Sequence, residues 1–339
     1  MRIVGLVFVV VAFGCGDRKQ DRVEAQPEDL STPIAAPVTV DAARPPSQCN
    51  AELSTFCDGD DVVECSREGQ RGKVVQTCTA GCTRGGCVET CAAKDVELVY
   101  VVDEARNFLS FDPRKLPGDP FHFIGTLDCA SRGSAFSMAV DNHGVAWVLF
   151  DDGLVFRVSI LDARCARTGY RLDGAPDGFG MGFATEKGGE TLYIAERHGR
   201  EELAIVDTST AQPGYRVVAP LRAGQTLNPE LSGTADGKLY GYFPQPTTGR
   251  PGFVTEIDRK TARPVGAKRS LPGSGEVGYY AFAHWGGTFF VFASHDGGNT
   301  KVHSIDRKTG AYKLAYGETA YRIVGAGVST CAPLAERVP

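Results

Sequence analysis

The sequence predicts an all-β protein, a β-propeller of about five four-stranded blades preceded by a small disulfide-rich module. Three observations lead to this fold class. An apolar strand pattern recurs five times, helical periodicity is nearly absent, and seven of the eleven cysteines gather in one short segment. Repeated short strands separated by tight turns are typical of propeller blades. A dense cysteine cluster is typical of a small unit that depends on crosslinks.

Residues 1–14 have the features of a bacterial signal peptide. Arg2 precedes an apolar run that is too short to cross a bilayer as a helix. The run ends in Ala12-Phe13-Gly14-Cys15, which resembles the bacterial lipobox, although the first two positions depart from its usual leucine and small residue. The resemblance implies cleavage before Cys15 and lipidation of its sulfur. An ordinary secretory signal with a chance cysteine is the alternative.

Residues 15–48 are interpreted as a disordered Pro-rich tether. They contain five prolines and no aromatic residue, so they can bury little apolar surface. A lipid on Cys15 would hold the chain on a membrane of the cell envelope, with the outer membrane favoured over the inner one. The folded part would then face the periplasm or the cell surface.

Residues 49–91 form the predicted disulfide module. The cluster contains no C-x2-C pair and no histidine, so the usual zinc pattern is absent. Large apolar residues are too few to supply a core, and crosslinks must supply stability instead. Short strands are expected at 61–65 and 73–78. The pairing of six cysteines is not determined by the sequence: Cys49, Cys57, Cys65, Cys78, Cys82 and Cys87.

Residues 95–331 carry the repeat, and residues 332–339 are a C-terminal tail. Each repeat has a strand of small residues, a tight turn, an apolar strand, and a further strand that ends in Asp and a turn, which fits a four-stranded blade. A sixth blade is the alternative if a long loop hides another repeat. The recurring apolar strands lie at 98–102, 146–150, 192–195, 239–243 and 289–293.

The two ends of the repeat region are expected to meet. The first repeat lacks its innermost strand, and the segment before Cys331 resembles that type of strand. A C-terminal strand that completes the first blade would close the ring and remove open edges. Cys91 could then pair with Cys331, and Cys129 could pair with Cys165. Setting aside the lipidated Cys15, ten cysteines are left to form disulfides.

The order of lipobox, Pro-rich tether, Cys-rich module and propeller resembles bacterial lipoproteins that are abundant in myxobacteria and their relatives. The repeats of residues 95–331 are similar to the broad YVTN and WD40-like group of β-propellers. This resemblance implies a fold and a place in the cell envelope. It implies no activity, because propellers include both binding proteins and unrelated enzymes.

The loops that follow the recurring apolar strand should share one face of the propeller. Their acids and histidines could bind Ca²⁺ or another divalent cation, or act in acid–base chemistry. The competing interpretation, which we favour, is that polar turns simply face water. The candidate residues are Asp103, Asp151, Glu196, His198 and His295.

Other features narrow the function. The net charge of −5 disfavours nucleic-acid binding, and no G-x-S-x-G or H-E-x-x-H motif occurs. The sequence therefore favours a lipoprotein that displays a propeller to a protein, peptide or glycan. An extracytoplasmic hydrolase or lactonase with a metal over the channel is the alternative. One aromatic stretch could stack on a sugar or peptide, but filling the space between blades is favoured: Tyr279, Tyr280, Trp285, Phe289 and Phe290.

Overall fold

A computed structural model shows the fold of residues 49 to 335, apart from short gaps. The predicted signal peptide, Cys15 and the tether lie outside the described residues, and so does the end of the tail. No helix in the described part of the chain is long and apolar enough to span a bilayer. The described residues are 49, 54–58, 61–77, 82–83, 85–87, 90–170, 178–187, 189–196, 201–209, 214–222, 228–245, 251–272, 277–295 and 297–335.

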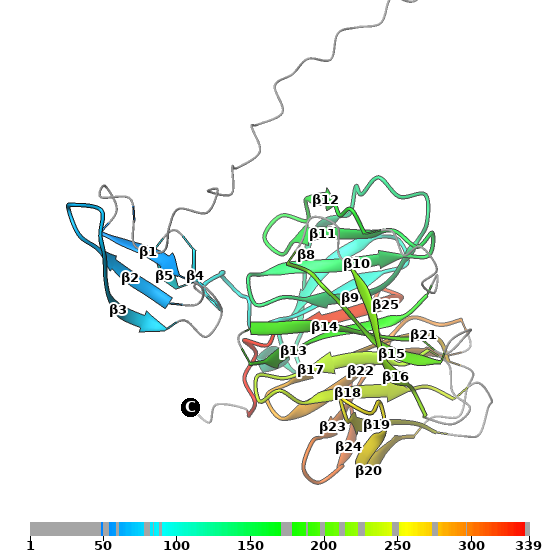
Figure 1. Ribbon diagram of the computed structural model, residues 1–339. Helices are drawn as coiled ribbons and strands as arrows, with labels where there is room; N and C mark the ends of the chain where they lie inside the picture. Colours follow the sequence, from blue (N-terminus) through cyan, green and yellow to red (C-terminus); the bar gives the residue numbers. More distant parts are fainter. Residues whose placement is uncertain are drawn as a thin grey trace, which may run out of the picture. The chain divides into compact units, whose positions relative to one another are not determined.

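Five four-stranded antiparallel sheets form the blades of a propeller (Figure 1). This confirms the predicted fold class and the count of five blades. From the innermost strand outward, blade one is β25 (Ile323–Val328), β6 (Val99–Asp103), β7 (Asn107–Phe111) and β8 (Phe121–Thr126), and blade two is β9 (Ala135–Val140), β10 (Val145–Phe150), β11 (Val155–Ser159) and β12 (Cys165–Arg167). Blade three is β13 (Gly180–Glu186), β14 (Gly189–Glu196), β15 (Glu202–Val206) and β16 (Tyr215–Pro220), and blade four is β17 (Glu230–Gly233), β18 (Leu239–Phe243), β19 (Gly252–Ile257) and β20 (Pro264–Leu271). Blade five is β21 (Val277–Trp285), β22 (Thr288–His295), β23 (Lys301–Asp306) and β24 (Tyr312–Tyr316). The one helical element among the described residues is the 3-10 turn η1 (Pro113–Lys115).

The innermost strands β25, β9, β13, β17 and β21 are neighbours of one another in a closed ring. Glycine allows them to approach closely. A Cβ atom on Gly180 would lie 1.9 Å from the carbonyl oxygen of Pro229, and one on Gly325 would lie 3.1 Å from the backbone of Ser137. The small residues that mark these strands in the sequence are therefore required by the crowding around the propeller axis.

The C-terminal strand completes the first blade, as the sequence predicts. β25 pairs with β6, with Val328 opposite Val99, so the last strand of the described residues lies beside β6, which comes first in the propeller. Next to this seam a disulfide joins Cys91 to Cys331, with 5.4 Å between their Cα atoms. A second disulfide joins Cys129 to Cys165.

The hydrophobic core consists of five clusters, in which side chains from neighbouring blades pack against one another. In one of them Phe111 of blade one contacts Phe290 and Phe292 of blade five edge to face, with ring centroids 5.3 and 5.2 Å apart. Trp285 and Phe289 are also buried. These aromatic residues fill space between blades, which is the interpretation the sequence favours for them.

The Cys-rich segment contains two small sheets, of strands β1 to β3 and of β4 with β5. Both expected strands occur, as β2 and β3, together with β1, β4 and β5, which the sequence does not predict. A disulfide joins Cys49 to Cys65, and Cys57 is disulfide-bonded as well. Cys78 and the side chains of Cys82 and Cys87 lie outside the described residues. The strands are β1 (Thr55–Asp58), β2 (Asp61–Cys65), β3 (Arg71–Thr77), β4 (Cys82–Thr83) and β5 (Gly86–Cys87).

Candidate functional site

One face of the propeller carries the loops that the sequence singles out. Neighbouring strands of a blade are antiparallel. In each blade, the end of the second strand therefore lies on the same side of the propeller as the start of the innermost strand. Asp103, Glu196 and His295 end β6, β14 and β22, and Asp151 follows β10. We call this side the entry face.

The entry face contains a cavity of about 330 Å³. This volume is within the range of small-molecule sites. Residues from blades one, two, four and five line it, so the cavity lies where blades converge and not within a single loop. The lining residues are Glu104, Ser134, Ala135, Phe136, Asp151, Glu230, Gly278, Tyr279, Tyr280 and Val324.

Glu230, the first residue of β17, is the most deeply buried acid of the cavity. Its side chain is 2% exposed, and its Oε2 accepts a hydrogen bond of 2.9 Å from the hydroxyl of Ser137 on β9. Burial raises the pKa of Glu230 well above its ordinary value, because a buried carboxylate loses its hydration. This shift favours the protonated form of the carboxyl group, which can donate a hydrogen bond as well as accept one.

A second acid of the cavity, Glu104, is paired. Arg322 donates to its Oε1 at 2.9 Å, so a nearby cation balances its negative charge. A hydrogen bond to Glu104 also raises the pKa of Tyr279. The neighbouring Tyr280 donates from its hydroxyl to the carbonyl oxygen of Asn228 at 2.9 Å. These bonds hold two aromatic rings in fixed orientations at the cavity.

Asp151 is the one sequence-predicted rim residue among those that line the cavity. It is exposed, and its Oδ1 accepts a hydrogen bond of 3.0 Å from the backbone N–H of Ser134. Arg106 supports the same loop region, because its guanidinium donates to the carbonyl oxygen of Ser131 at 2.8 Å and lies 5.2 Å from the ring centroid of Phe150.

Three other rim candidates do not line the cavity. Asp103 is 3% exposed and accepts hydrogen bonds from the backbone and side chain of Asn107, at 2.7 and 2.8 Å. Burial raises the pKa of Asp103. Glu196 accepts a bond of 3.2 Å from the backbone N–H of Glu201. The ring of His295 lies 6.3 Å from that of His303, between centroids.

The rim candidates do not form a metal centre within the part of the chain that the structure describes. No three of Asp103, Asp151, Glu196 and His295 offer ligand atoms within 4.8 Å of one another. His198, the remaining candidate, lies outside the described residues.

Sequence reasoning did not identify Glu230 or its partner Ser137 as site residues. The signal for Glu230 is an acid at the first position of an innermost strand, where the other blades have Ala135, Gly180, Val277 and Ile323. A charged side chain among small and apolar ones at a crowded position requires a reason, because burying it is unfavourable. That comparison between blades needs strand boundaries, which the repeat pattern gives only roughly.

Comparisons with known proteins report fold similarity at low sequence identity. No family model matches the chain, and no curated protein matches it in sequence. It is similar to TolB from Acinetobacter baumannii (14% identity, 66% of this chain and 53% of that one, TM-score 0.38). It is also similar to a gluconolactonase from Xanthomonas campestris (16% identity, 73% and 82%, TM-score 0.39) and to the calcium-binding protein regucalcin from Agrobacterium tumefaciens (12% identity, 68% and 74%, TM-score 0.37). The chain spans about half the length of TolB.

Proposed function

We propose that this chain is a lipid-anchored binding protein of the cell envelope, and that its propeller holds a neutral, hydroxyl-rich ligand of the glycan class at the entry face. One observation carries the choice of ligand. Aromatic rings and the buried carboxyl group of Glu230 line one cavity of about 330 Å³.

The chemistry of the lining favours a sugar. Aromatic faces pack against the C–H faces of sugar rings, and carboxyl and phenol groups bond to sugar hydroxyls. Phe136, Tyr279 and Tyr280 supply the rings. Glu104 is already paired with Arg322, so Asp151 supplies most of the charge. Such a cavity would attract a strongly cationic peptide only weakly, because little negative charge is left unpaired in it.

A screen with neutral oligosaccharides and with basic peptides, followed by calorimetric titration, tests the ligand class. We expect an oligosaccharide to bind and Tyr279→Ala to weaken its binding by about tenfold, because a stacked ring contributes about 1 kcal/mol or more. Tyr312→Ala is the matched control, since Tyr312 lies on the outer strand β24 and is 38% exposed. Binding of basic peptides alone, or equal effects of the two substitutions, would contradict the proposal.

Hydrolysis is the second candidate function, and one observation favours it. A general acid needs a raised pKa, and burial raises the pKa of Glu230 well above its ordinary value. Chromatography of the bound oligosaccharide after long incubation separates the two functions. An intact ligand supports binding alone. Cleavage that Glu230→Gln abolishes while binding persists would assign an enzyme.

The envelope location is supported by the sequence. The apolar N-terminal run, the lipobox-like Ala12-Phe13-Gly14-Cys15 and the Pro-rich tether resemble the layout of myxobacterial lipoproteins. The described part of the chain contains several disulfides, which persist in oxidising compartments.

Cell fractionation tests the anchor. We expect Cys15→Ser to move the protein from the membrane fraction to the free fraction, because acyl chains provide the membrane affinity. Ser31→Ala, in the tether, should leave the protein on the membrane. A Cys15→Ser protein that resists extraction from membranes as the wild type does would remove the lipid from the proposal.

A further inference from the structure

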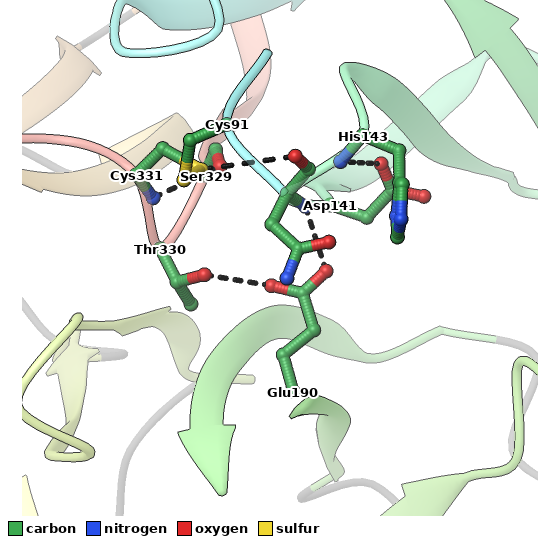
Figure 2. Close-up of a disulfide and its surroundings, with 8 residues drawn as sticks. Cys91, Asp141, His143, Glu190, Ser329, Thr330 and Cys331 are labelled. Carbon is green, nitrogen blue, oxygen red and sulfur yellow. Dashed lines mark hydrogen bonds between the residues drawn. A yellow bond between two sulfur atoms is a disulfide. The ribbon is translucent and has the colours of Figure 1, made fainter. Parts of the chain in front are cut away.

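We propose a binding site for a first-row divalent cation of the Zn²⁺ class, formed by Asp141, His143 and Glu190 on the face opposite the cavity. Asp141 and His143 lie in the turn between β9 and β10, and Glu190 lies near the start of β14 in the next blade. This turn leaves the far end of an innermost strand, so the site is separate from the glycan cavity. Figure 2 shows the three residues.

The geometry suits one shared ion. Each residue offers one ligand atom, and the three atoms all lie within 4.8 Å of one another. Zinc binds carboxylate oxygen and imidazole nitrogen at about 2.0–2.2 Å in a tetrahedral arrangement, so two ligands of one ion are separated by about 3.4 Å. Small side-chain rotations, above all of the exposed His143, bring the atoms within that distance.

Among the described residues, no salt bridge involves Asp141 or Glu190. Glu190 accepts hydrogen bonds from the backbone N–H of Asn142 at 2.7 Å and from the hydroxyl of Thr330 at 2.8 Å. Asp141 accepts from backbone N–H groups and from the indole N–H of Trp147 at 3.2 Å. In the described residues these donors are all neutral. A bound cation would balance the negative charge that these two carboxylates bring together.

A second, independent observation points to a ligand at this turn. Asn142 lies between Asp141 and His143 in the sequence and is 7% exposed. Its side-chain oxygen is buried without a hydrogen-bond partner in the described structure. Buried polar oxygens are normally satisfied, and a carboxamide oxygen is a known ligand for divalent cations. Asn142 could therefore supply a fourth donor to an ion held by the other three residues.

The donor set selects the class of cation. Carboxylate and amide oxygens alone would suit Ca²⁺ or Mg²⁺, but an imidazole nitrogen favours Zn²⁺ and its first-row neighbours. Tetrahedral zinc requires four ligands, which the three residues and either Asn142 or a water molecule would provide.

A bound ion would stabilise the region where the first and last segments of the propeller meet. Asn142 accepts a hydrogen bond of 2.9 Å from the backbone N–H of Cys91 at its carbonyl oxygen, and Glu190 accepts one from Thr330, next to Cys331. The Cys91–Cys331 disulfide lies beside these residues in Figure 2. An ion here would join blades two and three, which the hydrogen bond between Thr330 and Glu190 links to the segment that follows β25.

Equilibrium dialysis of the untagged full chain, first stripped with a chelator and then exposed to Zn²⁺ alone, tests the site. We expect one zinc ion per chain and a rise in melting temperature with zinc. His143→Ala and Glu190→Gln should each weaken zinc binding by at least about tenfold, a loss that even changes outside the ligand set can cause. His122→Ala is the matched control, because His122 is exposed on β8 of another blade.

Three outcomes would overturn the proposal. The first is the absence of stoichiometric zinc on the wild-type chain. The second is zinc that stays bound with unchanged affinity in both His143→Ala and Glu190→Gln. The third is a preference for Ca²⁺ or Mg²⁺ over Zn²⁺ in competition, which would contradict a role for the imidazole. Circular dichroism of each variant checks that lost binding does not reflect lost folding.

Discussion

The Cys-rich segment and the propeller reach stability by different means. In the described part of residues 49–91, the buried apolar side chains are Cys49, Val62 and Val63, while Val74 and Val75 are 42% and 51% exposed. The propeller has five hydrophobic clusters and many fully buried aromatic side chains. Because apolar burial is the dominant favourable term in folding, the segment must depend on its disulfides, and the propeller can depend on its core.

The largest expected difference between the two regions is their response to reduction of the disulfides. We expect a thiol reductant to remove hydrogen-exchange protection from β1, β2 and β3 completely, because too little core is left to hold them. The blades should stay protected under the same conditions. Equal loss of protection in the blades and in the Cys-rich sheet would show that the comparison is wrong.

The disulfide at the seam should matter more to the propeller than the disulfide between its outer strands. Cys91–Cys331 joins residues 240 positions apart, and Cys129–Cys165 joins residues 36 apart. Crosslinks that close longer loops restrict the unfolded chain more. We expect Cys91→Ala with Cys331→Ala to lower the free energy of unfolding by about 3–5 kcal/mol.

The double variant Cys129→Ala with Cys165→Ala is the control, with an expected loss about 1.5–2 kcal/mol smaller. Urea denaturation measures both losses. If the two are equal, loop length does not determine what a disulfide contributes to this fold.

Acid should lower the free energy of unfolding of the propeller by less than loss of the Cys91–Cys331 disulfide does. Burial lowers the pKa of His284 from 6.5 to about 3. Between these pH values the unfolded chain takes up a proton that the folded chain excludes. The contribution of neutral His284 to the free energy of unfolding is therefore fully present above pH 6.5 and decreases as the pH falls towards 3. We expect a loss of about 2–3 kcal/mol between pH 6.5 and 4.5.

His284→Gln, which does not titrate, should flatten that slope whatever its effect on stability at neutral pH. Chemical denaturation at several pH values measures the slope, with His122→Ala as a control on an exposed histidine. The Cys-rich segment contains no histidine and should show no such dependence. An unchanged slope in His284→Gln would place the acid sensitivity elsewhere.

The repeat pattern predicts most of the fold because equivalent strands of the five blades have the same packing surroundings. The apolar stretch 146–150 lies in β10, and 289–293 lies in β22, since these second strands are buried on both sides between neighbouring blades. The closing strand is predictable for the same reason. Residues 323–328 have the small and apolar side chains that an innermost position requires.

The site is less predictable because its contacts join distant parts of the chain. Ser137 and Glu230 are 93 residues apart, and Glu104 and Arg322 are 218 apart. Loop position alone also fails to show where a carboxylate points. Asp103 and Asp151 follow equivalent strands, but Asp103 accepts the N–H groups of its own turn whereas Asp151 lines the cavity.

Completion of blade one by β25 has a consequence for how the chain is made. The sheet that starts at Val99 stays one strand short until Ile323–Val328 has been synthesised. A nascent chain therefore carries an unpaired edge on β6 and an open ring until its last strand emerges from the ribosome. On the proposed route out of the cytoplasm, this arrangement would delay compaction and help the polypeptide to pass through the export channel unfolded.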